Sequence, residues 1–410
     1  MGRDNTSGLI QYLAVVFIAA GFIFVLFAST YTQTTQTWER EEEIPPVVIS
    51  PNPPTIPQPN VPPPIQVVNP PPPVLPVPPP KPISPPPPPV NPTPPPVVVV
   101  NPPPPPNPQK VFSCEYAKNS TNFYVDPTMQ AVRVEKELRN AGNIADADLL
   151  QQISCRPQGT WIIGDNLDTI RSRVISTVSK ATAAGKMPIL VLYNIPDHTT
   201  LRYWSGITAG DSYAQWVTAV AESIGDHDAW IILEPDSIGL VANLSDSDQA
   251  VRLADLKKAI LTLRAKAPKA RIYLDAGHSN WRKASSIANF LKTAGIDSAD
   301  GFALNVSNYQ YVSDEIAFGQ EVSTLIGNKH FVIDTSRNGS GPHKTEWCNA
   351  PGVTIGKVPT TTTGNVLVDA LLWVKLPGES DGPCNGGVPT GKFWTERALE
   401  MIKNSPFRFE

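Results

Sequence analysis

The sequence lacks the features by which several classes of protein are usually identified. It has no dense cluster of Lys and Arg, and its formal net charge is -4, so it offers no electrostatic surface for nucleic acid. It also has no phosphate-binding glycine loop, no triad of metal ligands and no Gly-x-Ser-x-Gly elbow. These absences argue against nucleotide-dependent enzymes, zinc hydrolases and serine esterases, and they give no sign of a metal or cofactor.

Cysteine is scarce, and its four residues form no Cys-x-x-Cys pair and lie outside zinc-ligand spacing of one another and of histidine. An even number of cysteines fits two disulfides in an oxidising compartment, although three pairings are possible and four free thiols are the alternative. The residues are Cys114, Cys155, Cys348 and Cys384.

Proline is concentrated in one tract, where 34 of the 47 prolines lie between Pro45 and Pro108 and aromatic residues are missing. Such a tract cannot form a packed core, so we expect residues 29–110 to be a proline-rich stalk, disordered or in polyproline II. If straight, the stretch from Pro45 to Lys110 would reach roughly 200 Å. Binding to SH3-like domains is the alternative use of such a tract.

One long apolar run, Leu9 to Ala28, follows a short tail of residues 1–8 and carries no charge. Its length of about 20 residues predicts a transmembrane helix, and a cleaved signal peptide is the alternative. The cysteines favour an extracytoplasmic position for the rest of the chain. The protein is therefore expected to be membrane-anchored, or secreted if the segment is cleaved.

Residues 111–410 have ordinary composition and are expected to form one domain. Apolar runs of strand length alternate there with amphipathic segments of helix length, which is typical of a β/α architecture with parallel strands. The predicted strands are Met187–Tyr193, Ala229–Pro235, Arg271–Gly277, Gly301–Ser307, His330–Ser336 and Leu371–Gly378; the predicted helices are 212–225, 250–268, 285–295 and 314–327.

Each predicted strand ends in a polar cluster: YNIPD, EPDS, DAGHSNW, NVSNY, DTSRNG or KLPGESDG. The carboxyl ends of parallel strands converge on one rim, so these clusters predict a single site. Asp, Asn and Gly also begin ordinary loops, which explains any one cluster but explains the carboxylates and aromatics together less well. Paired carboxylates and stacking aromatics are the equipment of a glycoside hydrolase.

From about Asn122 to Pro406 the chain resembles glycoside hydrolase family 6, whose members cleave β-1,4-glucan with inversion. The resemblance is carried by ordered motifs: NFYVDP, QGTW, AAGKMPILVLYNIP, IILEPDS, ARIYLDAGHSNW, NVSNY, VIDTSRNGSGP, EWC and DALLWVKLPGESDG. It implies a distorted seven-stranded parallel β/α barrel. It also implies a β-1,4-glucan or cello-oligosaccharide partner, and the short domain implies an open cleft and endo cleavage.

The resemblance assigns the catalytic carboxylates. Asp236 matches the general acid, with a helix-cap or loop Asp as the plainer interpretation. Asp381 matches the candidate base, with a structural ion pair to Lys375 or an Arg as the alternative. Inverting enzymes separate their carboxyl groups by roughly 6.5 to 9.5 Å to admit water.

Other positions match substrate contacts. Trp161, Trp281 and Trp347 match sugar-stacking positions, although core packing is the commoner fate of a tryptophan, and Tyr193 matches the tyrosine beneath the distorted sugar. Asp334 and Arg337 are expected to hold the site together. Cys348 and Cys384 match a family disulfide. Cys114 and Cys155 would tie the N-terminal segment to the loop before QGTW. The matching polar positions are Asp275, His278, Asn305, Asn308, Lys375 and Glu379.

One position departs from the family. Thr199 stands where the family has an Asp that raises the pKa of the acid. Either Asp197, two residues earlier, takes that role, or the role is lost and the rate falls by roughly 10² to 10³. We therefore predict weak or altered activity. A surface-displayed β-glucan-binding pseudoenzyme, and a structural surface protein in which the stalk is the functional part, are the alternatives.

Overall fold

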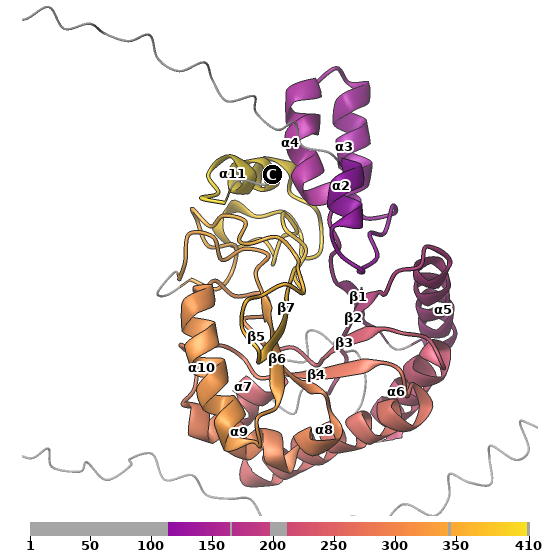
Figure 1. Cartoon of the computed structure of the whole chain (residues 1–410), viewed down its shortest axis with the longest axis vertical. Coiled ribbons are helices and arrows are strands. Elements are labelled where there is room, and N and C mark those ends of the chain that lie inside the picture. Colours follow the sequence, from indigo (N-terminus) through magenta and orange to yellow (C-terminus); the bar gives the residue numbers. More distant parts are fainter. Residues whose placement is uncertain (1–113, 165, 197–210, 343–345, 408–410) are drawn as a thin grey trace, which may run out of the picture. The chain divides into compact units, whose positions relative to one another are not determined.

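The computed structural model describes residues 114–164, 166–196, 211–342 and 346–407 (Figure 1). Seven parallel strands form one sheet, and each strand pairs with its neighbours in the sequence. All consecutive strands are therefore joined by crossover connections, as a β/α fold requires. The strands are β1 (Thr160–Ile162), β2 (Ile189–Leu192), β3 (Trp230–Leu233), β4 (Arg271–Asp275), β5 (Gly301–Leu304), β6 (His330–Asp334) and β7 (Val368–Leu372).

Helices surround the sheet on its outer side (Figure 1). The connecting helices are α5 (Leu167–Ala183), α6 (Asp211–Ile224), α7 (Ser237–Val241), α8 (Asp246–Lys266), α9 (Ala284–Thr293) with η1 (Ile296–Ser298), and α10 (Val312–Leu325). A second group packs around its own apolar cluster. It consists of α3 (Gln130–Asn140) and α4 (Ile144–Ser154), preceded by α2 (Cys114–Asn119), and of α11 (Thr395–Lys403), which follows η2 (Cys384–Gly386).

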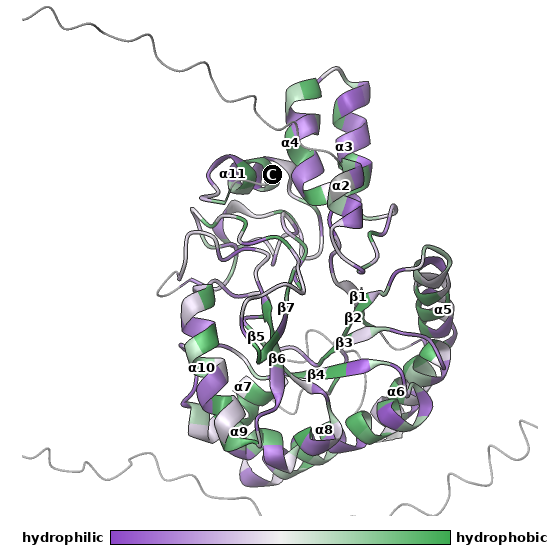
Figure 2. Ribbon diagram, in the orientation of Figure 1, coloured by the Kyte–Doolittle hydropathy of each residue, from purple (hydrophilic) through white to green (hydrophobic). Residues whose placement is uncertain are grey.

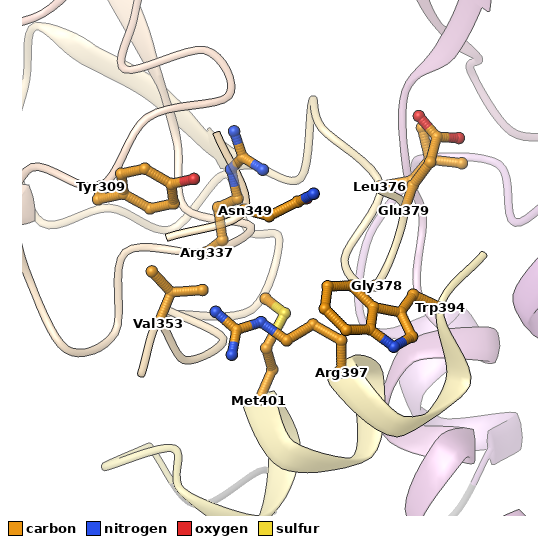
Figure 3. A pocket seen from close by; sticks show the side chains of 10 residues that line it. All are labelled: Tyr309, Arg337, Asn349, Val353, Leu376, Gly378, Glu379, Trp394, Arg397 and Met401. Carbon is orange, nitrogen blue, oxygen red and sulfur yellow. The ribbon is translucent and has the colours of Figure 1, made fainter. Parts of the chain in front are cut away.

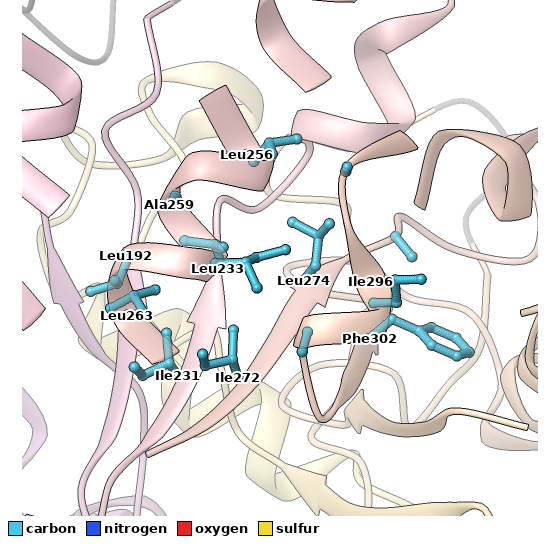
Figure 4. Close-up of a cluster of buried hydrophobic side chains, with 14 of the residues drawn as sticks. Leu192, Ile231, Leu233, Leu256, Ala259, Leu263, Ile272, Leu274, Ile296 and Phe302 are labelled. Carbon is cyan, nitrogen blue, oxygen red and sulfur yellow. The ribbon is translucent and has the colours of Figure 1, made fainter. Parts of the chain in front are cut away.

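Side chains alternate between the two faces of the sheet, as the pleat of a strand requires. Figure 4 shows the outer face, where residues of β2, β3 and β4 pack on α8; the side chains are Leu192, Ile231, Leu233, Ile272 and Leu274 against Leu256, Ala259 and Leu263. Their chain neighbours, such as Val191, Ile232 and Tyr273, fill the concave side. Figure 2 shows strands that are largely green and helices that carry both colours, as expected of buried strands and amphipathic helices.

The two edges of the sheet approach one another without pairing as strands. The backbone N–H of Gly159, just before β1, donates to Trp373 O at 2.8 Å, just after β7. Trp161 Nε1 donates to Val374 O at 2.9 Å. A Cβ on Gly159 would lie 2.5 Å from Val374 O, so only glycine permits this approach. The predicted seven parallel strands are confirmed, in the form of a curled sheet or half-barrel.

The strand predicted over Leu371–Gly378 is wrong in its bounds, because β7 is Val368–Leu372. The amides of Val374 and Lys375 donate to the Asp334 carboxylate, so the chain leaves the strand ladder there. The four predicted helices correspond to α6, α8, α9 and α10 and are confirmed.

Both disulfides form. Cys114 pairs with Cys155, and Cys348 pairs with Cys384. The predicted membrane segment Leu9–Ala28 and the stalk lie outside the described residues. Within residues 114–407, as far as the structure describes them, none of the helices has the length and hydropathy needed to cross a membrane.

Candidate active site

Polar side chains gather at the carboxyl edge of the sheet, where the sequence places them. Asp275 and Asp334 are the last residues of β4 and β6. Asp236, Asn305 and Lys375 follow β3, β5 and β7 within a few residues. Because all seven strands are parallel, these side chains share one rim.

Asp236 stands on a backbone turn that non-glycine residues rarely adopt, with φ of 70°. Its N–H donates to Asp275 Oδ1 at 3.0 Å, which fixes the end of the turn. Burial raises the pKa of Asp236 to about 6; the negative charge of Asp381 adds to this shift and Arg337 opposes it. Asp236 therefore retains its proton under mildly acidic conditions, as a general acid must.

Asp381 has the opposite environment. Arg337 Nη1 donates to its Oδ2 at 2.7 Å, and Lys375 Nζ lies 3.4 Å from its Oδ1. The backbone N–H of Asn349 also donates to Oδ2, while the N–H of Asp381 donates to Asn349 Oδ1, each at 2.9 Å. Burial would raise the pKa of Asp381, but Arg337, Lys375 and this amide together lower it. The ion pair considered as an alternative is thus present, and it keeps the carboxylate charged.

Asp334 connects three neighbouring strands. Its buried carboxylate accepts N–H groups from Ser307, Ser336, Val374 and Lys375, at 2.9 to 3.2 Å. These donors follow β5, β6 and β7 respectively. One side chain therefore sets the positions of three loops of the rim.

Asp275 is nearly inaccessible, with 1% of its surface exposed. Its Oδ1 accepts the N–H groups of Asp236 and Gly277, while Oδ2 has no hydrogen-bond partner in the described part of the chain. Burial, together with the nearby charge of Asp236, raises the pKa of Asp275 well above its ordinary value. The two carboxyl groups therefore resist simultaneous ionisation.

Two aromatic pairs line the rim. Trp161 and Tyr193 meet edge to face with ring centroids 5.5 Å apart, and both are partly exposed. His278 stacks on Trp281, also at 5.5 Å, and burial lowers the pKa of His278 to about 4. His278 is therefore neutral at neutral pH and can donate or accept a hydrogen bond.

Trp281 fits a recess made by two glycines. A Cβ on Gly239 would lie 2.5 Å from the indole, and one on Gly277 would lie 2.8 Å from it. Trp347 is different, because 66% of its surface is exposed. A broad apolar side chain in that position is available to stack on a sugar ring.

The remaining predicted polar residues differ in accessibility. Lys375 Nζ donates to Glu379 Oε1 at 3.1 Å, which links Glu379 to the Asp381 cluster. Asn308 is partly exposed, with Nδ2 donating to Val306 O at 2.9 Å. Asn305 is completely buried, and its amide bonds Gln310 and the backbone O of Asp334, so it stabilises the loop after β5.

Asp197 and Thr199, with the neighbouring Trp204, lie outside the described residues. The structure adds three residues to the site that the motifs did not single out, namely Glu234, Glu315 and Asn349. Glu234 sits in EPDS directly after an apolar strand, so a buried acid was visible in the sequence as a polar residue in that setting. Glu315 and Asn349 carry no comparable signal.

A small cavity lies beside the ion pair (Figure 3). Its volume of about 20 Å³ is enough for one water molecule and too small for a sugar. Figure 3 shows Trp394 and Arg397 on one side of it, facing Arg337 and Asn349. The cavity therefore belongs to the wall that supports Asp381 and is not the place where a glucan chain would lie.

The profile of the family described as "Glycosyl hydrolases family 6" matches residues 118–405. The chain belongs to glycosyl hydrolase family 6. It is 43% identical over 289 residues to endoglucanase A of Cellulomonas fimi, covering 70% of this chain and 62% of that protein. It is 38% identical over 284 residues to endoglucanase 1 of Streptomyces sp. (strain KSM-9), covering 67% and 78%.

A solved structure of a family 6 protein is similar throughout the domain. It is the endoglucanase Cel6 of Mycobacterium tuberculosis in complex with methyl-cellobiosyl-4-deoxy-4-thio-β-D-cellobioside, with a TM-score of 0.64 and 38% identity. The match covers 69% of this chain and 96% of that one. By contrast, the chain spans 62% of the length of endoglucanase A from both Cellulomonas fimi and Thermobispora bispora.

Proposed function

We propose that this family 6 protein is an endo-acting hydrolase of β-1,4-glucan that inverts the anomeric carbon, with Asp236 as general acid and Asp381 as base. The observation that carries the proposal is the opposite shift of the two carboxyl pKa values. Burial raises that of Asp236 to about 6, while Arg337 and Lys375, against the effect of burial, hold that of Asp381 below its ordinary value. Environments that separate two carboxyl pKa values define an acid and a base.

The chemistry follows from these protonation states. Asp236 donates its proton to the glycosidic oxygen as the bond from that oxygen to the anomeric carbon breaks. A water molecule forms the new bond from the opposite face and passes a proton to Asp381, directly or through a second water. Trp161, Trp281 and Trp347 would hold the sugar rings by stacking. Asp197 would assist if its carboxylate approaches Asp236.

Release of reducing ends tests the hydrolase. Carboxymethylcellulose and barley β-glucan are incubated with wild type, with Asp236→Ala and with Glu222→Gln, an exposed residue that pairs with Lys266. We expect release by wild type and Glu222→Gln and almost none by Asp236→Ala. No release by wild type, together with retained binding of cellohexaose measured by tryptophan fluorescence, would instead indicate the glucan-binding pseudoenzyme.

The names of the relatives, endoglucanase A and endoglucanase 1, support the endo mode. An endo enzyme lowers the viscosity of carboxymethylcellulose long before many reducing ends appear, which an exo enzyme does not.

We further propose that the apolar run Leu9–Ala28 anchors the enzyme with its catalytic domain outside the cytoplasm. Recovery of the full chain in washed membranes tests the anchor, and its recovery in the culture medium would indicate cleavage.

A further inference from the structure

Glu234 is a buried carboxylate that the proposed mechanism does not use. It follows β3, two residues before Asp236, and none of its surface is exposed. Its Oε1 and Oε2 accept the N–H of Asn194 at 3.1 and 2.9 Å, and Oε2 also accepts the N–H of Ile195 at 3.0 Å. Tyr213 Oη donates to Oε1 at 3.0 Å. Both oxygens are therefore engaged by donors that follow β2 or belong to α6.

The turn that carries Asp236 is strained on both sides of Pro235. Glu234 has φ of 50° and Asp236 has φ of 70°, in the left-handed region that non-glycine residues avoid. Such a backbone conformation is destabilising in itself and persists only when surrounding contacts fix it. The turn must therefore be held by specific contacts at both ends.

Two carboxylates supply those contacts. Asp275 accepts the N–H of Asp236 at the far end of the turn, and Glu234 attaches the near end to the backbone that follows Tyr193. Arg252, whose Nη2 donates to Pro196 O at 3.0 Å, fixes the next residue of that same segment. The position of Asp236 relative to Tyr193 thus depends on hydrogen bonds accepted by Glu234.

We propose that Glu234 is a positioning residue that holds the Glu234–Pro235–Asp236 turn against the Asn194–Ile195 backbone, so that the Asp236 carboxyl reaches the glycosidic oxygen. This inference rests on the proposed function, because it assumes that Asp236 is the acid. It predicts a specific defect, in which proton donation is lost while substrate binding and attack by water are retained.

Glu234→Gln tests the inference, because the amide keeps the shape but turns one acceptor into a donor that faces N–H or O–H groups. Two substrates separate the steps. The leaving group of barley β-glucan is a sugar hydroxyl that requires a proton, whereas that of 2,4-dinitrophenyl β-cellobioside leaves without one. We expect kcat on the glucan to fall about 100-fold, since small misplacements cost this much. The kcat of Glu234→Gln on the aryl cellobioside should stay within about threefold of the wild-type value.

Asp369→Asn is the matched control, because Asp369 also accepts a tyrosine hydroxyl, Tyr273 Oη at 2.7 Å, but lies near the start of β7, at the opposite end of the strand from the rim. Its ratio of the two rates should equal that of wild type. Equal losses on both substrates in Glu234→Gln would overturn the inference while leaving the proposed function intact. A wild type inactive on both substrates would overturn the proposed function itself.

A second variant covers the case in which Glu234→Gln fails to fold, as judged by circular dichroism. Tyr213→Phe keeps the carboxylate and the ring, which stacks on Trp216, and removes one donor. We expect a smaller loss, about three- to tenfold, confined to the glucan. An unchanged ratio of the two rates in Tyr213→Phe would then count against the inference.

Discussion

Arg337 and Asp381 form an ion pair of 2.7 Å in which only 7% and 9% of the two side chains are exposed. Arg337 Nε also donates to Ser307 O at 3.0 Å, and its guanidinium lies 4.6 Å from the centre of the Tyr309 ring. The pair therefore joins the loops that follow β5, β6 and β7. It fixes both the charge and the place of the carboxylate that we propose as base.

The pH profile of kcat/KM should be bell-shaped with an acidic optimum. Asp236 works protonated and has a pKa of about 6, so the rate should fall as pH rises through 6. Asp381 works ionised and has a lowered pKa, so the acidic limb should lie below the ordinary range of Asp. Initial rates on barley β-glucan between pH 3 and pH 9 measure both limbs.

Arg337→Gln should move the acidic limb of that profile upward, because removal of the positive charge lets the pKa of Asp381 rise. The alkaline limb should move upward as well, because Arg337 also opposes the raised pKa of Asp236, but by less, since Arg337 acts on Asp236 through its charge alone and on Asp381 through a hydrogen bond too. An acidic limb that stays in place would argue against Asp381 as the titrating base.

Gly239→Ala should weaken glucan binding. Gly239 lies in α7, where alanine is compatible with the backbone, but the added methyl would lie 2.5 Å from the Trp281 ring. Displacement of the indole should raise KM for cellohexaose roughly tenfold, the loss of about one stacking contact. Leu240→Ala, at the exposed neighbouring position, is the control and should leave KM unchanged. Equal KM values in the two variants would exclude Trp281 as a platform.

Removal of either disulfide should lower the stability of the protein, but only removal of the Cys348–Cys384 disulfide should also lower kcat/KM. Their cysteines are 41 and 36 positions apart, so each removal should cost a similar free energy of unfolding, roughly 4 kcal/mol. Cys348 is flanked by Trp347 and Asn349, which bonds Asp381, so Cys348→Ser with Cys384→Ser should also lower kcat/KM. The Cys114→Ser, Cys155→Ser variant should keep its kcat/KM at a temperature where both proteins remain folded. Equal losses of kcat/KM would show that the Cys348 loop does not set the site.

Glu315→Gln should stabilise the protein at alkaline pH. Burial raises the pKa of Glu315 from 4.5 to about 7, although Ser279 hydrogen bonds oppose the shift, and its Oε2 has no partner in the described residues. The stability of the neutral form is therefore fully present below pH 4.5 and is lost as pH rises through 7. The free energy of unfolding of Glu315→Gln, relative to that of wild type, should rise by on the order of 3 kcal/mol between pH 4 and pH 9. Urea unfolding of both proteins at the two pH values measures this rise. A difference between the proteins that is the same at both pH values would contradict the prediction.

The residues at the carboxyl ends of the strands could be predicted from the sequence, whereas most hydrogen bonds between them could not. Apolar runs that end in Asp or Asn identify the carboxyl ends of β4, β5 and β6, because a strand's polar termination is a local signal. The donors to Glu234 come from 21 to 40 positions earlier in the chain, and most of those to Asp334 follow two other strands. Such contacts depend on register and loop conformation, which no local pattern specifies. The end of β7 could not be predicted for the same reason. Trp373 and Val374 continue the apolar run of the strand, but the N–H groups of Val374 and Lys375 donate to a distant carboxylate.

The order of the sheet also bears on how the domain assembles. Every strand pairs with the strand that precedes or follows it in the chain, so the sheet can grow one strand at a time as the polypeptide emerges. The contact between the two edges is the exception, because Trp161 and Val374 are 213 positions apart. Closing it carries a larger loop-closure cost than pairing two consecutive strands and must wait for β7. Asp381 lies seven residues beyond Val374, so the proposed base is synthesised only at the stage of chain growth at which the two edges can first meet, long after the proposed acid that follows β3.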